Sequence, residues 1–206
     1  MILGGIVIKK ILNALGLSDA ADNFKNVRTI TLTAVLIALT VIANRLLIIP
    51  VGPMLEIRFG FIFLSLIAFL FGPVVAFSAG FLTNLLGFLM FSSGGAFNPL
   101  FDLNVGLAGV LYAVFLYKRN PKSEYFIIRI TAAKASVNLI CNILINTRLL
   151  VMFGFIPAPT AGIVTLTRVF KNFALLPVEI ILMLVVFKFV SVYAYKYNFI
   201  KQQKAG

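Results

Sequence analysis

Six apolar stretches, separated by short polar or Gly- and Pro-rich breaks, run along the 206 residues of the chain. A helix that spans a bilayer needs roughly 20 predominantly apolar residues. The stretches therefore predict transmembrane helices at about 28–49, 58–72, 73–91, 101–118, 126–150 and 163–192. The second stretch is the weakest, with about fifteen residues, so we expect that helix to be short, tilted or partly re-entrant. The predicted fold class is an all-α integral membrane protein with six transmembrane helices.

The residues before the first stretch follow a different pattern. Apolar side chains recur at helical spacing across 2–17, but Lys9 and Lys10 interrupt them and the segment is too short to span a bilayer. We expect 1–24 to be an amphipathic, interfacial segment, 25–195 the six-helix transmembrane domain and 196–206 a basic cytoplasmic tail. A signal peptide has a charged region, an apolar core and a small-residue cleavage site in that order, and none is expected here.

Lysine and arginine are distributed unequally between the loops. One set of loops and termini holds Lys9, Lys10, Lys25, Arg28, Lys118, Arg119, Lys122, Lys188, Lys196, Lys201 and Lys204. The opposite set holds only Arg45, Arg58 and Arg148. Cytoplasmic loops carry the excess of Lys and Arg, so both termini are predicted to be cytoplasmic, with loops 45–58, 92–100 and 151–163 outside. A site built from these three loops would open to the exterior.

Composition supports the membrane class and excludes several kinds of chemistry. Hydrophobic residues make up 61% of the chain, above the half-apolar composition of soluble domains. The chain has no His, its single Cys141 lies in an apolar run, and it has no phosphate-cradling Gly-rich loop or nucleophile–base pair. No metal, no cofactor and no enzymatic activity are therefore expected.

The net charge of +12 raises the question of nucleic acid. The basic residues lie between the spans and not in a patch interleaved with aromatic residues. Cytoplasmic loops that face the anionic lipid of a bilayer explain this distribution better. We therefore expect the lipid bilayer, and no nucleic acid, as the partner of these charges.

Polar side chains interrupt the fifth stretch, although a charge in hydrocarbon is costly unless it faces a cavity or a partner. Lys134, Asn138, Asn142 and Asn146 recur every four residues and form one slowly rotating stripe, about 18 Å long on a helix. Amides that join neighbouring helices would explain such a stripe. Three amides and a lysine exceed what packing needs, which favours the wall of a polar ligand site.

The sixth stretch begins with Arg168, Lys171 and Asn172 near its predicted outer end. Arg168 and Lys171 either clamp an anionic ligand or extend to lipid headgroups. Glu179 falls on the Arg168 face three turns later. We expect Glu179 to pair with a basic residue of a neighbouring helix, such as Lys134, as a structural link.

Two acids stand where predicted spans begin. Glu56, with Arg58, precedes the second span, and Asp102 opens the fourth beside Asn98. A carboxylate can accept two N–H donors side by side. Glu56 is the stronger candidate for that role, because Asp102 is already explained as compensation of a helix dipole. Phenylalanines that could stack on a flat ring lie near these positions: Phe59, Phe61, Phe97 and Phe101.

Ala34 and Ala38 form a small-xxx-small pair on the first span. Small residues allow two helices to approach closely. Packing within the bundle is the default interpretation of the pair, and a docking face for another membrane protein is the alternative.

Several motifs follow one another along most of the membrane region. They are LEIRFGF at 55–61, LFGPVV at 70–75, GFLTNLLG at 80–87, FSSGGAF at 91–97, GLAGVLY at 106–112, NT at 146–147, RVFKN at 168–172 and LP at 176–177. In the order and spacing of these motifs, over about 28–190, the chain resembles the substrate-binding S components of energy-coupling factor (ECF) vitamin transporters, most closely the folate type. The folate type usually has an acid where this chain has Asn84 and an aromatic residue where it has Arg148.

The resemblance implies a multi-pass protein of a bacterial cell membrane that binds one vitamin with high affinity in a pocket near the outer face. It also implies docking, through Ala34 and Ala38, to a module of one membrane coupling protein and two ATPase subunits. Since the chain lacks a nucleotide-binding motif, those subunits would hydrolyse the ATP.

Folate, a dianion with a flat polar ring, is the ligand that the resemblance favours. Glu56, or less favourably Asp102, would read the amino edge of the pterin. The other ring contacts would come from Asn98, Asn142 and Asn146, with Phe61 and Phe97 over the faces. The glutamate carboxylates would meet Arg58, Arg148, Arg168 and Lys171. Three alternatives stay open: another vitamin (pantothenate, riboflavin or a thiamin precursor), a small membrane-embedded enzyme acting on lipid headgroups, and a scaffold subunit whose polar residues only join helices.

Overall fold

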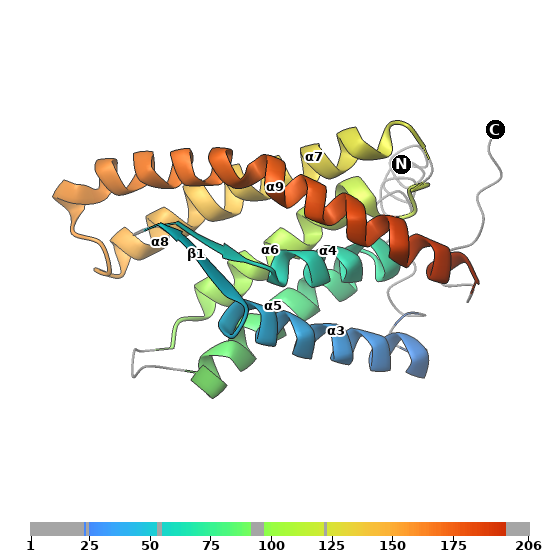
Figure 1. The fold of residues 1–206 in the computed structure, drawn as a ribbon. Coiled ribbons are helices and arrows are strands. Elements are labelled where there is room, and N and C mark those ends of the chain that lie inside the picture. The colour runs from blue at the N-terminus through green and yellow to red at the C-terminus, as the bar shows by residue number, and fades with distance from the viewer. Residues whose placement is uncertain (1–22, 24, 53–54, 92–96, 122, 197–206) are drawn as a thin grey trace, which may run out of the picture.

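The computed structural model describes residues 23, 25–52, 55–91, 97–121 and 123–196 (Figure 1). In chain order its elements are α3 (Val27–Arg45), β1 (Ile48–Gly52), β2 (Leu55–Arg58), α4 (Gly60–Phe71), α5 (Pro73–Phe91), α6 (Pro99–Leu116), α7 (Phe126–Ser136), η2 (Val137–Ile145), α8 (Asn146–Met152), η3 (Ala158–Thr160) and α9 (Ala161–Lys196). Except for Asn23 and Lys196, the predicted interfacial segment and basic tail lie outside the described residues.

Five of the described helical segments are long and apolar enough to cross a bilayer: α3, α5, α6, the run from α7 through α8, and η3 with α9. The sixth, α4, has 12 residues. Its length of about 18 Å falls short of the roughly 30 Å hydrocarbon core. The all-helical membrane fold is confirmed, and the second hydrophobic segment is short, as expected.

The short helix α4 lies inside the bundle, where it contacts α3, α5, α6 and α9. Nine of its 12 residues are buried, and its one polar residue, Ser65, donates a hydrogen bond to the Ile62 carbonyl at 2.8 Å. The Phe69 ring packs edge-on against Phe126 and Phe187, with centroids 6.0 and 5.1 Å away. Because α4 is surrounded by protein, an all-apolar helix suits it, and it can end before reaching the far membrane surface.

The segment between α3 and α4, expected to be a loop, forms an antiparallel hairpin of β1 and β2. Ile48 pairs with Arg58, and the register shifts between Pro50 and Gly52. Short runs with β-branched residues stand on both sides of a Gly-Pro pair, a composition typical of strand, turn and strand. The hairpin ends α3 earlier than predicted and brings Arg58 to the start of α4.

The helix from Phe126 to Met152 is continuous, but its middle third, η2, is π-helical. In an α-helix, residues four apart are rotated by about 40° relative to one another. π turns contain more residues, so they offset part of that rotation. The predicted polar stripe therefore stays on one side, and Lys134, Asn142 and Asn146 line the same cavity.

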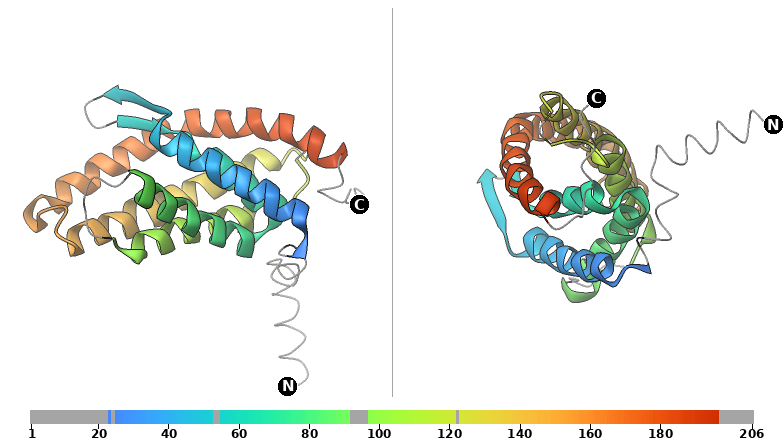
Figure 2. Two further views of the ribbon diagram at one scale, coloured as in Figure 1. Left: turned by 90° about the horizontal axis from the view of Figure 1, so that it is seen from below. Right: turned by 90° about the vertical axis from the view of Figure 1, so that its right-hand side faces the viewer.

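The first described helix begins, and the last one ends, at the same end of the bundle (Figures 1 and 2). The hairpin and the connection between α8 and α9 lie toward the opposite end. An even number of crossings produces this arrangement. α9 packs along α7, η2, α4 and α8, and its N-terminal half lies at the hairpin end. Which end faces the cytoplasm stays a prediction.

Candidate functional site

A cavity of about 680 Å³ lies between the N-terminal half of α9, the α7–η2–α8 helix, the start of α4 and the hairpin. Small-molecule sites have volumes of roughly 300–1,000 Å³. The described lining consists of Asn44, Arg58, Phe61, Lys134, Asn142, Asn146, Ile163, Val164, Thr167, Arg168, Lys171, Asn172, Leu175 and Glu179.

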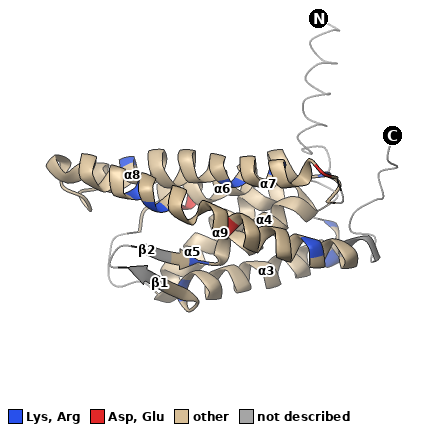
Figure 3. Cartoon of the chain, turned by 45° about the horizontal axis from the view of Figure 1, so that its top comes forward, with Lys and Arg blue, Asp and Glu red and all other residues tan. Residues whose placement is uncertain are grey.

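The cavity carries an excess of positive charge. Four cationic side chains and one acid belong to the described lining, which gives those residues a net charge of +3. Arg58 comes from β2, Lys134 from α7, and Arg168 and Lys171 from α9. Figure 3 colours the Lys and Arg positions of the chain blue and the Asp and Glu positions red. Among the described residues, no three His, Cys, Asp or Glu side chains gather as metal ligands. The lining is suited to an anion that also forms hydrogen bonds to amides.

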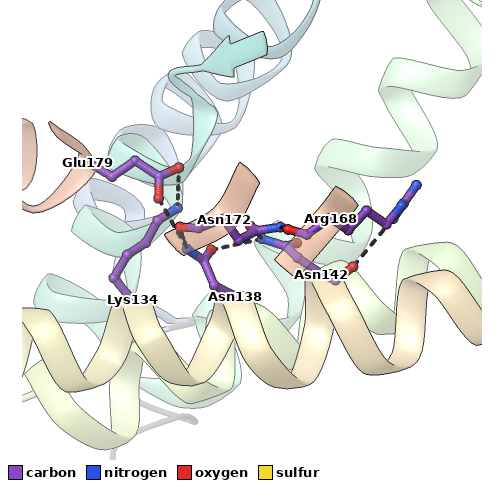
Figure 4. A network of polar contacts seen from close by, with 6 residues as sticks. All are labelled: Lys134, Asn138, Asn142, Arg168, Asn172 and Glu179. Atoms are coloured by element: carbon purple, nitrogen blue, oxygen red, sulfur yellow. Dashed lines mark hydrogen bonds and ion pairs between the residues drawn. The ribbon is translucent and has the colours of Figure 1, made fainter. Parts of the chain in front are cut away.

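Lys134 and Glu179, the acid of the described lining, form a buried ion pair at the cavity wall (Figure 4). Lys134 Nζ lies 3.0 Å from Glu179 Oε1, and the two side chains are 3% and 12% exposed. Asn138 donates from Nδ2 to Glu179 Oε2 at 3.2 Å. Lys134 Nζ also lies 3.8 Å from the centroid of the Phe61 ring, a cation–π contact. The predicted pairing of Glu179 with Lys134 is confirmed.

Amide contacts continue from this ion pair and connect η2 with α9 (Figure 4). Asn142 Nδ2 donates to Asn138 Oδ1 at 3.0 Å and to Asn172 Oδ1 at 3.5 Å. Asn172 Nδ2 donates to the Arg168 carbonyl at 2.8 Å, and Arg168 Nη1 donates to the Asn142 carbonyl at 3.4 Å. The polar residues therefore join two helices and, at the same time, line the cavity.

A smaller cavity of about 260 Å³ adjoins the first and shares Asn44, Arg58 and Asn142 with it. Its described lining also includes Val41, Arg45, Thr83, Asn84, Gly87 and Val105. Thr83 is buried, and its hydroxyl has no hydrogen-bond partner among the described residues. The two cavities therefore share part of their wall.

Six predicted site residues lie together in the lining of the larger cavity: Arg58, Phe61, Asn142, Asn146, Arg168 and Lys171. They come from β2, α4, η2, α8 and α9, which are distant in sequence. Three helices (α4, the continuous α7–η2–α8 helix and α9) and the hairpin are needed to bring these side chains into one space.

Two predicted site residues at the start of α6 lie outside the described lining and bond to other protein groups. Asn98 is the N-cap of α6, and its Oδ1 accepts the backbone N–H of Leu100 at 3.0 Å. Asp102 is fully buried, and Asn84 Nδ2 donates to its Oδ1 at 2.6 Å. Neither belongs to the described lining of the two cavities.

Three further predicted residues lie elsewhere or are only partly described. Arg148 is exposed on α8, outside the described lining of both cavities. Phe97 is 46% exposed and packs against Phe88, with ring centroids 5.3 Å apart. Glu56 lies in β2 and pairs with Pro50, and its side chain lies outside what the structure describes.

Asn44 and Thr167 line the site but were not predicted. Asn44 had a signal in the sequence, because it is a lone amide inside an apolar span. Thr167 had none, because threonine hydroxyls in helices commonly bond their own backbone, as Thr167 does with the Ile163 carbonyl at 2.9 Å.

Comparison with known proteins decides the family. The model of the family described as "ECF-type riboflavin transporter, S component" matches residues 24–192. The chain belongs to this S-component family. The match covers every described helix except the last residues of α9, and it confirms the resemblance drawn from the sequence motifs. This S component is accordingly a multi-pass membrane protein and part of a transporter.

Individual relatives of this S component carry a more specific name. "Folate transporter FolT" of Clostridium novyi is 26% identical over 167 residues, which are 81% of this chain and 92% of that one. "Folate transporter FolT" of Leuconostoc mesenteroides subsp. mesenteroides is 28% identical over 156 residues, 74% and 80% of the two chains. A crystal structure of FolT bound with folic acid matches with a TM-score of 0.63 and 33% identity, over 77% of this chain and 91% of that one.

Proposed function

We propose that this S component captures folate in the larger cavity as the first step of its import across the cell membrane. The observation that carries the proposal is the described lining: a net excess of three positive charges, several amides and one phenylalanine around a cavity of about 680 Å³. Folate combines a flat, hydrogen-bonding ring with two carboxylates, so each part of the molecule has a chemical complement there. The similarity to proteins named folate transporters supports the same ligand.

The residues of the larger cavity divide into two groups in this proposal. Arg58, Arg168 and Lys171 bind the glutamate carboxylates, because fixed cations form the strongest hydrogen bonds to them. Asn142 and Asn146 contact the polar ring and Phe61 packs against it. Asn98, Asp102, Phe97 and Arg148 are left out, since they lie outside the described lining.

Riboflavin is the second candidate, because the matching family is described as a riboflavin transporter component. Riboflavin has a flat ring but no carboxylates. It would bring no anionic group to Arg58, Arg168 and Lys171, whose cationic side chains form their strongest hydrogen bonds to carboxylates. The charge of the cavity therefore favours folate.

The energy for import comes, in this proposal, from partners: one membrane coupling protein and two ATPase subunits. Ala34 and Ala38 lie exposed on α3, beside the exposed apolar residues Ile30 and Val35. Small side chains on an exposed apolar helix allow another membrane helix to approach closely. We assign the docking of the coupling protein to this face of α3.

Calorimetric titration of the purified protein in detergent tests the ligand. The chain has no Trp, so heat is a better readout than intrinsic fluorescence. We expect saturable one-to-one binding of folate with a Kd below about 1 µM, equivalent to roughly −8 kcal/mol. Riboflavin, pantothenate and thiamin, at the same concentrations, should give no saturable heat. Tight binding of riboflavin with none of folate would contradict the proposal.

A further inference from the structure

We propose that Glu179 is the residue that recognises the amino-pyrimidinone edge of the ligand ring, with Lys134 and Asn138 as the residues that position its carboxylate. The inference rests on the proposed function, because it concerns the ring of folate. It assigns to Glu179 a part in ligand specificity in addition to the structural ion pair.

The carboxylate of Glu179 has acceptor capacity left after its contacts within the protein. A carboxylate offers about four lone-pair sites. Lys134 occupies one on Oε1, at 3.0 Å, and Asn138 occupies one on Oε2, at 3.2 Å. Within the described chain, one acceptor position stays open on each oxygen. Glu179 lines the larger cavity, and its side chain is 12% exposed, so we infer that the carboxylate meets a ligand bound there.

The chemistry of the ring edge matches this arrangement. An amino-pyrimidinone presents two parallel N–H donors, one from the exocyclic amine and one from the adjacent ring nitrogen. Two parallel donors bind one carboxylate in the fork geometry known from arginine–carboxylate pairs. Two fixed contacts also prevent the Glu179 side chain from rotating away, and Phe61, held against Lys134, provides an apolar ring beside the carboxylate.

The other two acids considered for this role have weaker positions. Asp102 is 0% exposed, is bonded to Asn84, and belongs to the described lining of neither cavity. Glu56 lies in β2, and its side chain is not described. Among the described side chains, Glu179 is the acid that lines the larger cavity.

The distribution of charge along α9 then orients the ligand. The Lys134–Glu179 pair is neutral as a unit, which suits an uncharged ring. Arg168 and Lys171 lie eleven and eight residues before Glu179 in the same helix, about 16 and 12 Å away along its axis. The ring lies at Glu179 and the carboxylates lie at Arg168 and Lys171, near the start of α9.

The test compares folate with its 2-desamino analogue, which lacks the exocyclic amine, on the wild-type protein and on Glu179→Gln. We expect loss of the amine to weaken wild-type binding roughly 10- to 100-fold, since it removes a hydrogen bond to a charged group. Glu179→Gln should weaken folate binding by a similar factor. In this variant the Kd of the analogue should exceed that of folate by less than about threefold. A wild-type penalty that persists in Glu179→Gln would overturn the inference.

Matched variants separate the alternatives. Glu124→Gln, on an exposed residue outside the cavities, should keep the full penalty for the analogue. If Glu56→Gln removes the penalty and Glu179→Gln does not, Glu56 is the recognising acid and the inference fails. If Glu179→Gln does not fold, the double variant Lys134→Gln with Glu179→Gln, which removes both buried charges, is titrated with folate and the analogue instead. Failure of the wild-type protein to bind folate at all would refute the proposed function and is a separate result.

Discussion

Arg168 is the cation whose surroundings in the larger cavity are described most fully. Its Nη1 donates to the Asn142 carbonyl at 3.4 Å, and its side chain is half-buried in the cavity lining. A guanidinium has five N–H donors in a planar fork, so within the described contacts most of them are available to a carboxylate. Arg168 is therefore suited to hold one end of the ligand while its own orientation is fixed by η2.

Replacement of Arg168 should weaken folate binding. We expect Arg168→Gln to raise the Kd for folate roughly 10- to 100-fold, because it removes a charge-assisted hydrogen bond. The Kd of Arg168→Lys should lie between those of the wild type and Arg168→Gln, because lysine keeps the charge but lacks the planar fork of N–H donors. Calorimetry measures the effect, with the exposed Arg119→Gln as the control. Equal Kd values for Arg168→Gln and the wild type would exclude Arg168 from the site.

The Lys134–Glu179 pair should matter for stability as well as for the ligand. Lys134→Met leaves the Glu179 carboxylate in a largely buried position without its cation, and breaking a buried pair costs about 3–5 kcal/mol. The double variant Lys134→Met with Glu179→Gln removes that carboxylate charge and should recover most of the lost stability. Thermal unfolding in detergent without ligand measures both. A double variant no more stable than Lys134→Met would show that the ion pair is not the cause.

At the scale of elements, the helices could be predicted from the sequence and two local structures could not. Long apolar runs and Gly-Pro breaks marked six helical segments, including the short α4. The hairpin was missed because strands this short carry little pattern of their own. The π turns of η2 were missed because side chains that are distant in the sequence donate hydrogen bonds to their backbone carbonyls. Asn104 Nδ2 donates to the Cys141 carbonyl at 3.1 Å, and Arg168 donates to the next carbonyl in η2.

Helices α5 and α6 pack closely because glycine lies at their crossing. A Cβ added to Gly80 would lie 2.5 Å from the Val105 carbonyl oxygen, a distance that real structures do not show. We expect Gly80→Val to separate the two helices and to lower stability by about 1–3 kcal/mol or more. It should also weaken folate binding, since Val105 lines the smaller cavity, which shares Asn44, Arg58 and Asn142 with the larger one.

The matched control for this prediction is Gly162→Val in α9, where an added Cβ would have no atom within 4 Å. Thermal unfolding and calorimetry of the two variants give the comparison. If both variants unfold at the wild-type temperature, the close packing of α5 and α6 does not limit stability.

In the whole molecule, the two ends of the described chain lie at the same end of the bundle, and the positive-inside pattern predicts that they are cytoplasmic (Figure 1). Cysteine labelling tests this orientation. In a Cys141→Ser background, Thr160→Cys, between α8 and α9, should react with a membrane-impermeant maleimide on intact cells. Ser123→Cys, between α6 and α7 at the other end, should react only after the membrane is opened. Both positions are exposed, so access to the reagent decides the result. The reverse labelling pattern would overturn the predicted topology.

Most residues of the site could be predicted from the sequence, but their arrangement in space could not. The stripe on 134–146 and the cations of α9 were visible as polar residues in apolar spans. The structure places Lys134, Asn142 and Asn146 of the stripe around one cavity with Arg168 and Lys171. The sequence could not separate them from Asn98 and Asp102, which look equally polar. Asn98 caps α6 and Asp102 is buried against Asn84, and both contacts depend on backbone positions or on another helix.

We propose that the vitamin binds in the cavity between α9, η2, α4 and the hairpin. A structure of the protein determined with folate bound tests it most directly. We expect ligand density in this cavity, with the carboxylates within hydrogen-bond distance of Arg168 and Lys171 and the ring against Glu179 and Phe61. Folate bound elsewhere, for instance beside Arg148 and Phe97, with this cavity empty, would contradict the account.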